Sequence, residues 1–165
     1  MNCPGADDSM AQTCTIIPPT ATHSFEAFVE LRICLASDVT AVSAFIDDVM
    51  RFVARFRARD GGEVDIEIAL REAILNAVLH GNREEPGARV FVAIRCSLDG
   101  EVLITMRDQG NGFDIRAVPD PIAPGNLMST SGRGIYLMRA CMDEVWFEEG
   151  GTVACMRKRS KKVRI

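Results

Sequence analysis

Two polar side chains, Glu72 and Asn76, stand one helical turn apart in residues 65–82, which read DIEIALREAILNAVLHGN. Wound as a helix at about 100° per residue, this stretch places both side chains in one narrow stripe with aliphatic residues on either side. An ordinary surface helix has one apolar face and one polar face, so a carboxylate and an amide framed by aliphatic residues are expected to line a ligand site. Taken alone, the helix fits a solvated pair at i, i+4 equally well.

A second polar motif comes directly after a predicted strand. Strands are predicted over residues 88–97 and 101–107, joined by a turn in which Asp-Gly is a strong hairpin signal. The second strand leads into Asp108, Gly110, Gly112 and Phe113, in the order D-Q-G-N-G-F. Two glycines spaced by one residue let the backbone come close to a ligand, and Asp108 can accept hydrogen bonds from that ligand. Alone, the pattern D-x-G-x-G is a weak signal, because turns contain such triplets by chance.

A third motif, STSGRG at residues 129–134, opens an apolar helix predicted over residues 135–142. Free amides at a helix start, with hydroxyl groups and an arginine beside them, can bind an anion. A capped helix after a flexible loop is the alternative, and it would be favoured if the motif stood alone. Residues 114–131, which precede the helix, are rich in proline and have little periodicity, as is typical of lids and binding loops.

The elements that must position these motifs follow from hydrophobic spacing. Residues 1–24 show no sustained period and are predicted to be a flexible leader, so that one domain spans residues 25–165. A strand is predicted over residues 25–35, and a Phe-rich helix over residues 42–56 is expected to begin after Ser37 or Asp38. Gly81 is expected to end the central helix in a left-handed conformation. Residues 145–158 are predicted to form a closing hairpin.

Composition limits the class of protein. A chain of 165 residues, 47% hydrophobic and 25% charged, fits one soluble globular domain. No apolar run approaches the length of a membrane span and no signal-peptide pattern is present, so we expect a cytoplasmic protein. The last nine residues, RKRSKKVRI, are strongly basic, whereas the rest of the chain is acidic. Such a tail can contact nucleic acid or an acidic partner, although a solubilising end to the last strand is the favoured interpretation.

The cysteines and histidines predict neither a disulfide scaffold nor a zinc site. The chain has six cysteines without a C-x-x-C pair, and they are expected to be free thiols that are mostly buried. Its two histidines, His23 and His80, are not close to a cysteine cluster in the sequence. We expect His80 and Asn82, at the end of the central helix, to have structural roles first.

The three motifs in this order resemble the ATP-binding fold that is shared by gyrase, the 90 kDa heat-shock chaperones, histidine kinases and the mismatch-repair proteins. Within that group, REAILNAVLHGN and SGRGIYLMRACMDEV look most like the anti-sigma-factor serine-protein kinases of bacteria. The resemblance extends from about residue 25 to the C-terminus. It implies an α/β (α+β) two-layer sandwich, with helices on one face of a mixed, mostly antiparallel sheet and a nucleotide site under a lid loop.

The resemblance also implies a role for each motif residue. Glu72 would be the catalytic carboxylate that orients or deprotonates the acceptor hydroxyl, and Asn76 would hold the Mg²⁺ that bridges the phosphates of ATP. Asp108 would bind the adenine amino group, and the proline-rich segment would be the lid. Thr130 precedes the S-G-x-G pattern where family members differ, so no γ-phosphate contact is assigned to it. The other nucleotide-binding residues implied are Gly110, Gly112, Phe113, Ser131, Gly132, Arg133 and Gly134.

Two functions of different class follow. The first is an ATP-dependent serine-protein kinase and anti-sigma factor, which phosphorylates an anti-anti-sigma partner and sequesters a sigma factor; the presence of Glu72 favours it. The alternative is an ATP-dependent protein-binding regulatory module with little or no kinase activity. A histidine-kinase catalytic half would need a phospho-accepting histidine on a helical hairpin, and a gyrase-like ATPase would need a following transducer domain. We expect no direct contact with nucleic acid or membrane, and the Phe-rich helix predicts a homodimer.

Overall fold

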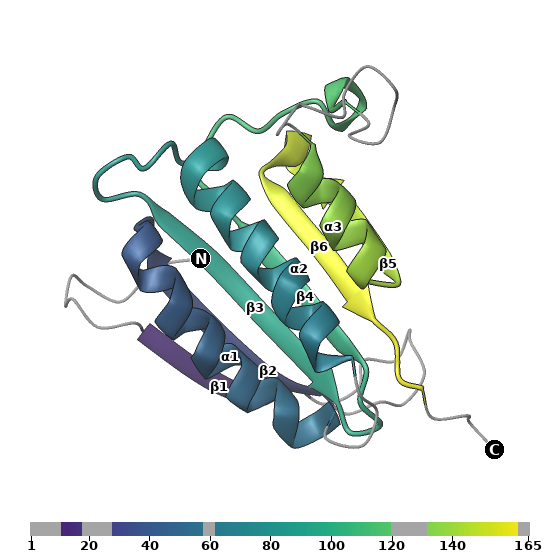
Figure 1. Ribbon diagram of the computed structural model, residues 1–165. Helices are drawn as coiled ribbons and strands as arrows, with labels where there is room; N and C mark the ends of the chain where they lie inside the picture. The colour runs from purple at the N-terminus through teal and green to yellow at the C-terminus, as the bar shows by residue number, and fades with distance from the viewer. Residues whose placement is uncertain (1–10, 18–27, 58–61, 120–131, 162–165) are drawn as a thin grey trace.

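The computed structural model describes the backbone of residues 11–17 and residues 28–57, 62–119 and 132–161 in full. Six strands form one sheet in the order β1-β2-β3-β4-β6-β5, and all five neighbouring pairs are antiparallel. The three α-helices cover one face of this sheet (Figure 1). The two-layer architecture expected from the sequence is therefore confirmed. The strands are β1 (Ala11–Ile17), β2 (Phe28–Ala36), β3 (Arg89–Ser97), β4 (Val102–Arg107), β5 (Glu144–Glu148) and β6 (Val153–Lys158).

The central strands form because apolar residues alternate along them. In β3, Val90, Val92, Ile94 and Cys96 are buried and the residues between them are more exposed over most of the strand. This period of two places the buried set on the face that the helices cover. The turn to β4 is tight, with Gly100 at a φ of 100°, as the Asp-Gly pair predicted.

Helix α1 (Val42–Arg57) packs an apolar stripe onto the sheet. Its start is preceded by a short 3₁₀ turn, Val39–Ala41, in which the Asp38 side chain accepts a hydrogen bond from the Thr40 amide at 2.8 Å. Phe45 is fully buried in the chain's own core, together with the aliphatic residues of the same stripe. The apolar residues that suggested a dimer interface are thus largely used within the monomer.

Helix α2 (Glu63–Leu75) lies between α1 and α3 (Arg133–Cys141), packed against both. Its acidic first turn, with Glu63 and Asp65, interacts favourably with the helix dipole. The helix then widens into a π-helical turn, η2 (Asn76–Gly81), in which the Asn82 amide donates to the Ala77 carbonyl at 2.8 Å. Turns of this kind are rare and occur frequently at functional sites.

Three details differ from what the sequence predicted. Part of the segment interpreted as a leader, Ala11–Ile17, is strand β1 and pairs along its whole length with β2. Gly81 does not have the left-handed conformation expected of a C-terminal cap, because the wider π turn ends the helix instead. Cys34 is disulfide-bonded, whereas Cys96, Cys141 and Cys155 are free thiols as expected.

Within the described part of the chain, no helix is both long enough and apolar enough to cross a membrane.

Candidate functional site

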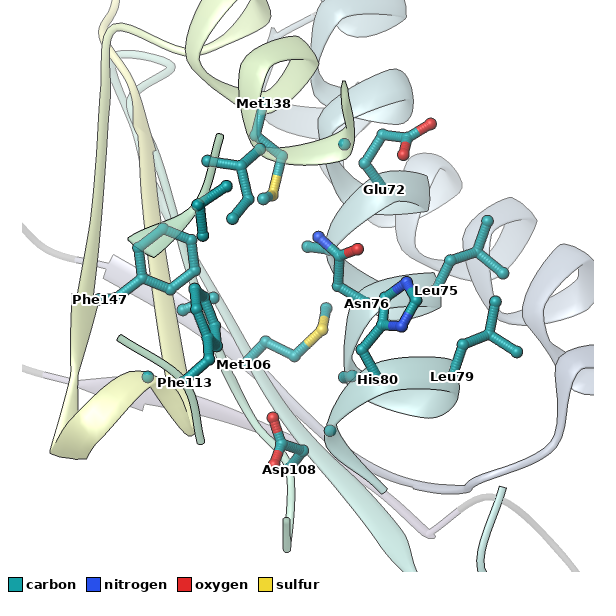
Figure 2. Close-up of a pocket in the computed structure, with 18 of the residues that line it drawn as sticks. Glu72, Leu75, Asn76, Leu79, His80, Met106, Asp108, Phe113, Met138 and Phe147 are labelled. Atoms are coloured by element: carbon teal, nitrogen blue, oxygen red, sulfur yellow. The ribbon is translucent and has the colours of Figure 1, made fainter. Parts of the chain in front are cut away.

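A cavity of about 570 Å³ lies between the helical layer and the edge of the sheet formed by β4, β6 and β5. One side is built by α2 and η2, another by the first turns of α3, and the floor by residues of β4, β5 and β6. It brings together residues of all three sequence motifs, which are far apart in the chain. Figure 2 labels Glu72 and Asn76 of the first motif and Asp108 and Phe113 of the second. The predicted site residues that line it are Glu72, Asn76, Asp108, Phe113, Gly132, Arg133 and Gly134.

Glu72 and Asn76 line the cavity from α2 and the first residue of η2. Neither side chain forms a hydrogen bond or an ion pair with the residues that the structure describes. Their neighbour Arg71 is instead turned to Glu67, at 3.4 Å. A carboxylate and an amide in a cavity, without partners in the described chain, are available to a ligand.

Gly134, in the first turn of α3, lies directly over this pair. A Cβ atom at that position would be 2.9 Å from Glu72 Oε2 and 3.3 Å from both polar atoms of the Asn76 amide. Only glycine lets the α3 backbone approach the two side chains so closely. The backbone amides at the start of α3 are consequently next to the carboxylate and the amide.

The start of α3 is held from the other side by the beginning of the proposed lid. Gly132 precedes the helix with a φ of 81°, and a Cβ atom there would be 2.4 Å from the Pro119 carbonyl oxygen. Val118, next to Pro119, lines the cavity. Ser131 and residues 120–130, which include most of the predicted lid, lie outside the described residues.

Asp108 lies at the opposite end of the cavity, directly after β4 (Figure 2). Its Oδ1 accepts a hydrogen bond from the Gly110 amide at 2.8 Å. Burial raises the pKa of this carboxyl above its ordinary value, although the hydrogen bond from Gly110 opposes the change. The glycine at position 81 lets η2 approach Asp108 closely, because a Cβ atom there would be 2.4 Å from the Asp108 carboxyl carbon. A half-buried carboxylate with acceptor sites still available suits a donor on a ligand.

Asn82 joins the central helix to the strand ends. Its Oδ1 accepts from the Gln109 amide at 2.7 Å, and its Nδ2 donates to the Arg89 carbonyl at 3.0 Å. The Gln109 side chain in turn accepts from the Arg89 amide at 2.7 Å. Asn82 is buried and has the structural role expected of it, whereas His80 is exposed and lines the cavity.

The two glycines of the D-x-G-x-G motif contact the protein itself. A Cβ atom on Gly110 would be 2.0 Å from the Gly81 carbonyl oxygen, and one on Gly112 would be 2.1 Å from the Gly150 carbonyl oxygen. Neither glycine is among the residues that line the cavity. Their lack of a side chain lets η2 and the β5–β6 turn pack against the motif, which places Asp108 and Phe113 on the cavity wall.

Apart from Phe113, sequence reasoning assigned no apolar residue to the cavity. Met106 lies on β4, two residues before Asp108, so alternation continued past the end of the strand could have placed the two side chains on the same face. Phe147 in β5 meets the Phe113 ring edge to face, with centroids 5.3 Å apart, and no local signal connects residues so distant in the chain. The apolar lining also includes Ala73, Ala77, Val118, Ile135, Met138 and Ala154.

Comparison with known proteins agrees with this geometry. Residues 35–158 match the family model described as "Histidine kinase-like ATPase domain". The chain is also 27% identical over 151 residues to proteins named "Serine-protein kinase RsbW" from Staphylococcus aureus, in strains bovine RF122 / ET3-1 and MRSA252. These alignments cover 87% of this chain and 93% of each relative. The resemblance predicted from the three motifs is confirmed, and the chain belongs to the histidine kinase-like ATPase domain family.

Proposed function

We propose that the protein is an ATP-dependent serine-protein kinase that phosphorylates an anti-anti-sigma partner and sequesters a sigma factor. The observation that carries this proposal is the placement of Glu72. Its carboxylate lies in the cavity, without a partner among the described residues, one turn from Asn76 and 2.9 Å from where a Cβ of Gly134 would be. A site that only bound nucleotide would not need a carboxylate beside the start of α3.

The geometry of the cavity supports one orientation for ATP. The adenine amino group would donate to Asp108, and the apolar wall with Met106 would contact the base. The phosphates would then lie at the other end, against the amides of Gly132 to Gly134. In this orientation the γ-phosphate is next to Glu72, where an acceptor hydroxyl must also enter.

The reaction that follows from this arrangement is an in-line transfer. The serine Oγ of the partner attacks the γ-phosphorus, the bond to the β–γ bridging oxygen breaks, and ADP leaves. Glu72 orients the hydroxyl and accepts its proton, while the amides at the start of α3 stabilise the charge on the transferred group. Catalysis of this kind depends on position and electrostatics, both of which the cavity can supply.

The residues present fit a magnesium ion that is held mainly by the nucleotide. Among the described residues there is no cluster of three His, Cys, Asp or Glu side chains that could hold a metal by itself. Mg²⁺ bound to ATP needs only one or two protein oxygens besides phosphates and water. The Asn76 amide oxygen, beside the start of α3, is suited to that role. The ion would neutralise phosphate charge during transfer.

The identity of the partners rests on the motif resemblance and on the names of the relatives. Proteins named "Serine-protein kinase RsbW" match along 87% of this chain, which supports the serine substrate. The sigma-factor role and the homodimer are proposed from the resemblance, and the cytoplasmic location stays an expectation from the sequence. The structure's contribution is the cavity in which transfer would occur.

Nucleotide binding is the first test. ATP with Mg²⁺ should raise the melting temperature, because a ligand that binds only the native state stabilises it, by about 2.7 kcal/mol at 100 times Kd. In Asn76→Ala the part of this shift that depends on Mg²⁺ should be lost, and adding EDTA to the wild type should reproduce the variant. No shift of the wild type at millimolar ATP and Mg²⁺ would refute the proposal. Radiolabelled ATP with candidate serine-bearing partners then separates a kinase from a binding module.

A further inference from the structure

The turn between β5 and β6, η4 (Glu149–Gly151), contacts the nucleotide-binding motif through its backbone. We propose that this turn is a positioning element that sets the selectivity of the cavity for adenine, because it holds Asp108 and Phe113 in place. The proposal rests on the function proposed above, since it concerns the base of the bound ATP. No motif in the sequence analysis included these residues as part of the site.

The turn has an unusual conformation for a hairpin connection. Three consecutive residues have positive φ angles: 49° at Glu149, 67° at Gly150 and 93° at Gly151. A glutamate with a positive φ is uncommon, and such a conformation persists only where surrounding contacts impose it. The contacts that impose it here are with the motif after β4.

The turn and the motif interlock backbone to backbone. The Phe113 amide donates to the Gly150 carbonyl at 2.9 Å. A Cβ atom on Gly112 would be 2.1 Å from the same carbonyl oxygen, and one on Gly151 would be 2.6 Å from the Phe113 carbonyl oxygen. Each segment therefore needs glycine in order to fit the other.

The same turn also fixes the backbone of Asp108. The Asp108 amide donates to the carbonyl of Thr152, the first residue after the turn, at 3.1 Å. The Thr152 hydroxyl donates to the Glu149 carbonyl at 3.0 Å, and Arg107 forms an ion pair with the Glu149 carboxylate. Phe113 is thus attached to the turn directly, and Asp108 is attached through Thr152, whose hydroxyl group bonds to the turn.

Both attached residues face the base end of the cavity (Figure 2). Phe113 is 39% exposed and lines the cavity, and its ring contacts Phe147 edge to face. A Cβ atom on Gly151 would be 2.9 Å from Cδ1 of this ring and 2.8 Å from the Phe113 amide. A side chain at position 151 would therefore displace Phe113 and change the distance between the Phe113 ring and Asp108.

The test compares the affinities for ATP and for inosine triphosphate, which has a carbonyl oxygen in place of the adenine amino group. The Kd for inosine triphosphate divided by the Kd for ATP measures recognition of that amino group. In Gly151→Ala we expect this ratio to fall about tenfold, because a displaced Phe113 no longer places the amino group of the base at its acceptor, Asp108. A role that was only structural would lower the melting temperature and leave the ratio unchanged.

Two glycine variants separate contact from backbone strain. Gly150→Ala adds a Cβ atom at a φ of 67° that has no other atom within 4 Å. It therefore introduces left-handed backbone strain in the same turn but does not displace Phe113. Its ratio should change less than about threefold. Gly87→Ala places Cβ at a φ of 85° in an exposed turn, also with nothing within 4 Å, and should have the wild-type ratio.

Thr152→Val provides a milder variant if Gly151→Ala does not fold. It keeps the shape of the side chain and removes only the hydrogen bond to the Glu149 carbonyl, so the ratio should fall about threefold. A wild-type ratio in Thr152→Val, and in Gly151→Ala if that variant folds, with ATP bound, would overturn the positioning role alone. A wild-type protein that binds neither nucleotide would overturn the proposed function, and with it this inference.

Discussion

Two glutamates, Glu30 on strand β2 and Glu72 on helix α2, have opposite surroundings. On the face away from the helices, Glu30 is fully buried and accepts hydrogen bonds from the Nε atoms of Arg32 and Arg95. On the helical side, Glu72 lines the cavity and forms no hydrogen bond or ion pair with the described residues. Burial raises the pKa of Glu30, but the two arginines outweigh it and hold the pKa below its ordinary value.

This difference indicates which carboxylate serves the fold and which serves a ligand. Glu30 has its partners within the chain, so removing it leaves two arginines without an acceptor and should affect stability. Glu72 has no such partner among the described residues, so removing it costs the fold little and should affect chemistry. The predictions below test that division, beginning with the largest expected effect.

Glu72→Gln should abolish most of the phosphoryl transfer while leaving ATP bound. Glutamine keeps the size and hydrogen bonding of the side chain but cannot accept a proton. Transfer to a serine partner should fall by roughly two to four orders of magnitude, the usual contribution of a positioned general base. The rate is measured with radiolabelled ATP, and affinity is measured separately.

Glu67→Gln is the matched control for Glu72→Gln. Glu67 lies on the same helix, is half exposed, and pairs with Arg71 at 3.4 Å. Its loss should leave both transfer and ATP affinity unchanged, since exposed pairs of this kind contribute little. Transfer by Glu72→Gln at a rate near that of the wild type would contradict the assignment of Glu72.

Asp108→Asn should weaken ATP binding by about one to two orders of magnitude, because it replaces a charged acceptor for the adenine amine with a neutral amide. Burial raises the pKa of Asp108 in the folded protein, and the bound amine favours the charged form. Wild-type affinity should therefore decrease as the pH falls through this raised pKa. The variant should lack that component, which calorimetry at several pH values can measure.

The same substitution should not destabilise the free protein. A carboxyl group whose pKa is raised by folding opposes folding when it is charged, and asparagine removes this cost while its oxygen still accepts from Gly110. Asp48→Asn, on α1 and paired with Arg51, is the control for affinity. Unchanged ATP affinity in Asp108→Asn would remove Asp108 from the site.

The fold could be predicted wherever a short hydrophobic period determines which residues are buried. Alternation along β3 and the apolar stripe of α1 both follow from local sequence, and the structure places these elements within a few residues of their predicted ends. Strand β1 was missed because it is an edge strand with no sustained apolar period, and its pairing with β2 is a contact between distant segments. The π turn was missed because it depends on the close approach of Gly81 to Asp108.

The candidate site could be predicted only where a motif is continuous in the sequence. Spacing placed Glu72 and Asn76 on one stripe and put Asp108 at a strand end. Spacing could not show what each glycine would contact. Gly112 was expected to approach the nucleotide, but a Cβ atom at that position would be 2.1 Å from the Gly150 carbonyl oxygen. Phe113 was implied as a site residue, but its contact with Phe147 could not be predicted, since the two rings meet only in the folded chain.

Glu30→Gln should have the smallest effect on function and a measurable effect on stability. It replaces a charged acceptor of two arginines with a neutral one. Because the arginine side chains are 45% and 42% exposed, water can compensate in part, and we expect a loss of about 1–2 kcal/mol in the free energy of unfolding. The Kd for ATP should stay within about twofold of the wild type, because this glutamate is on the face away from the cavity.

The pH dependence of unfolding distinguishes this role from simple packing. The pKa of Glu30 is lowered on folding, so its contribution to stability is fully present above the ordinary glutamate pKa of 4.5 and is lost as the pH falls through the folded value. The stability difference between wild type and Glu30→Gln should therefore be constant near neutral pH and shrink in acid. A stability difference that stayed constant from pH 7 to the acid transition would mean that glutamine disturbs packing and that the arginine pairs contribute nothing. The contrast between Glu30 and Glu72 would then be wrong.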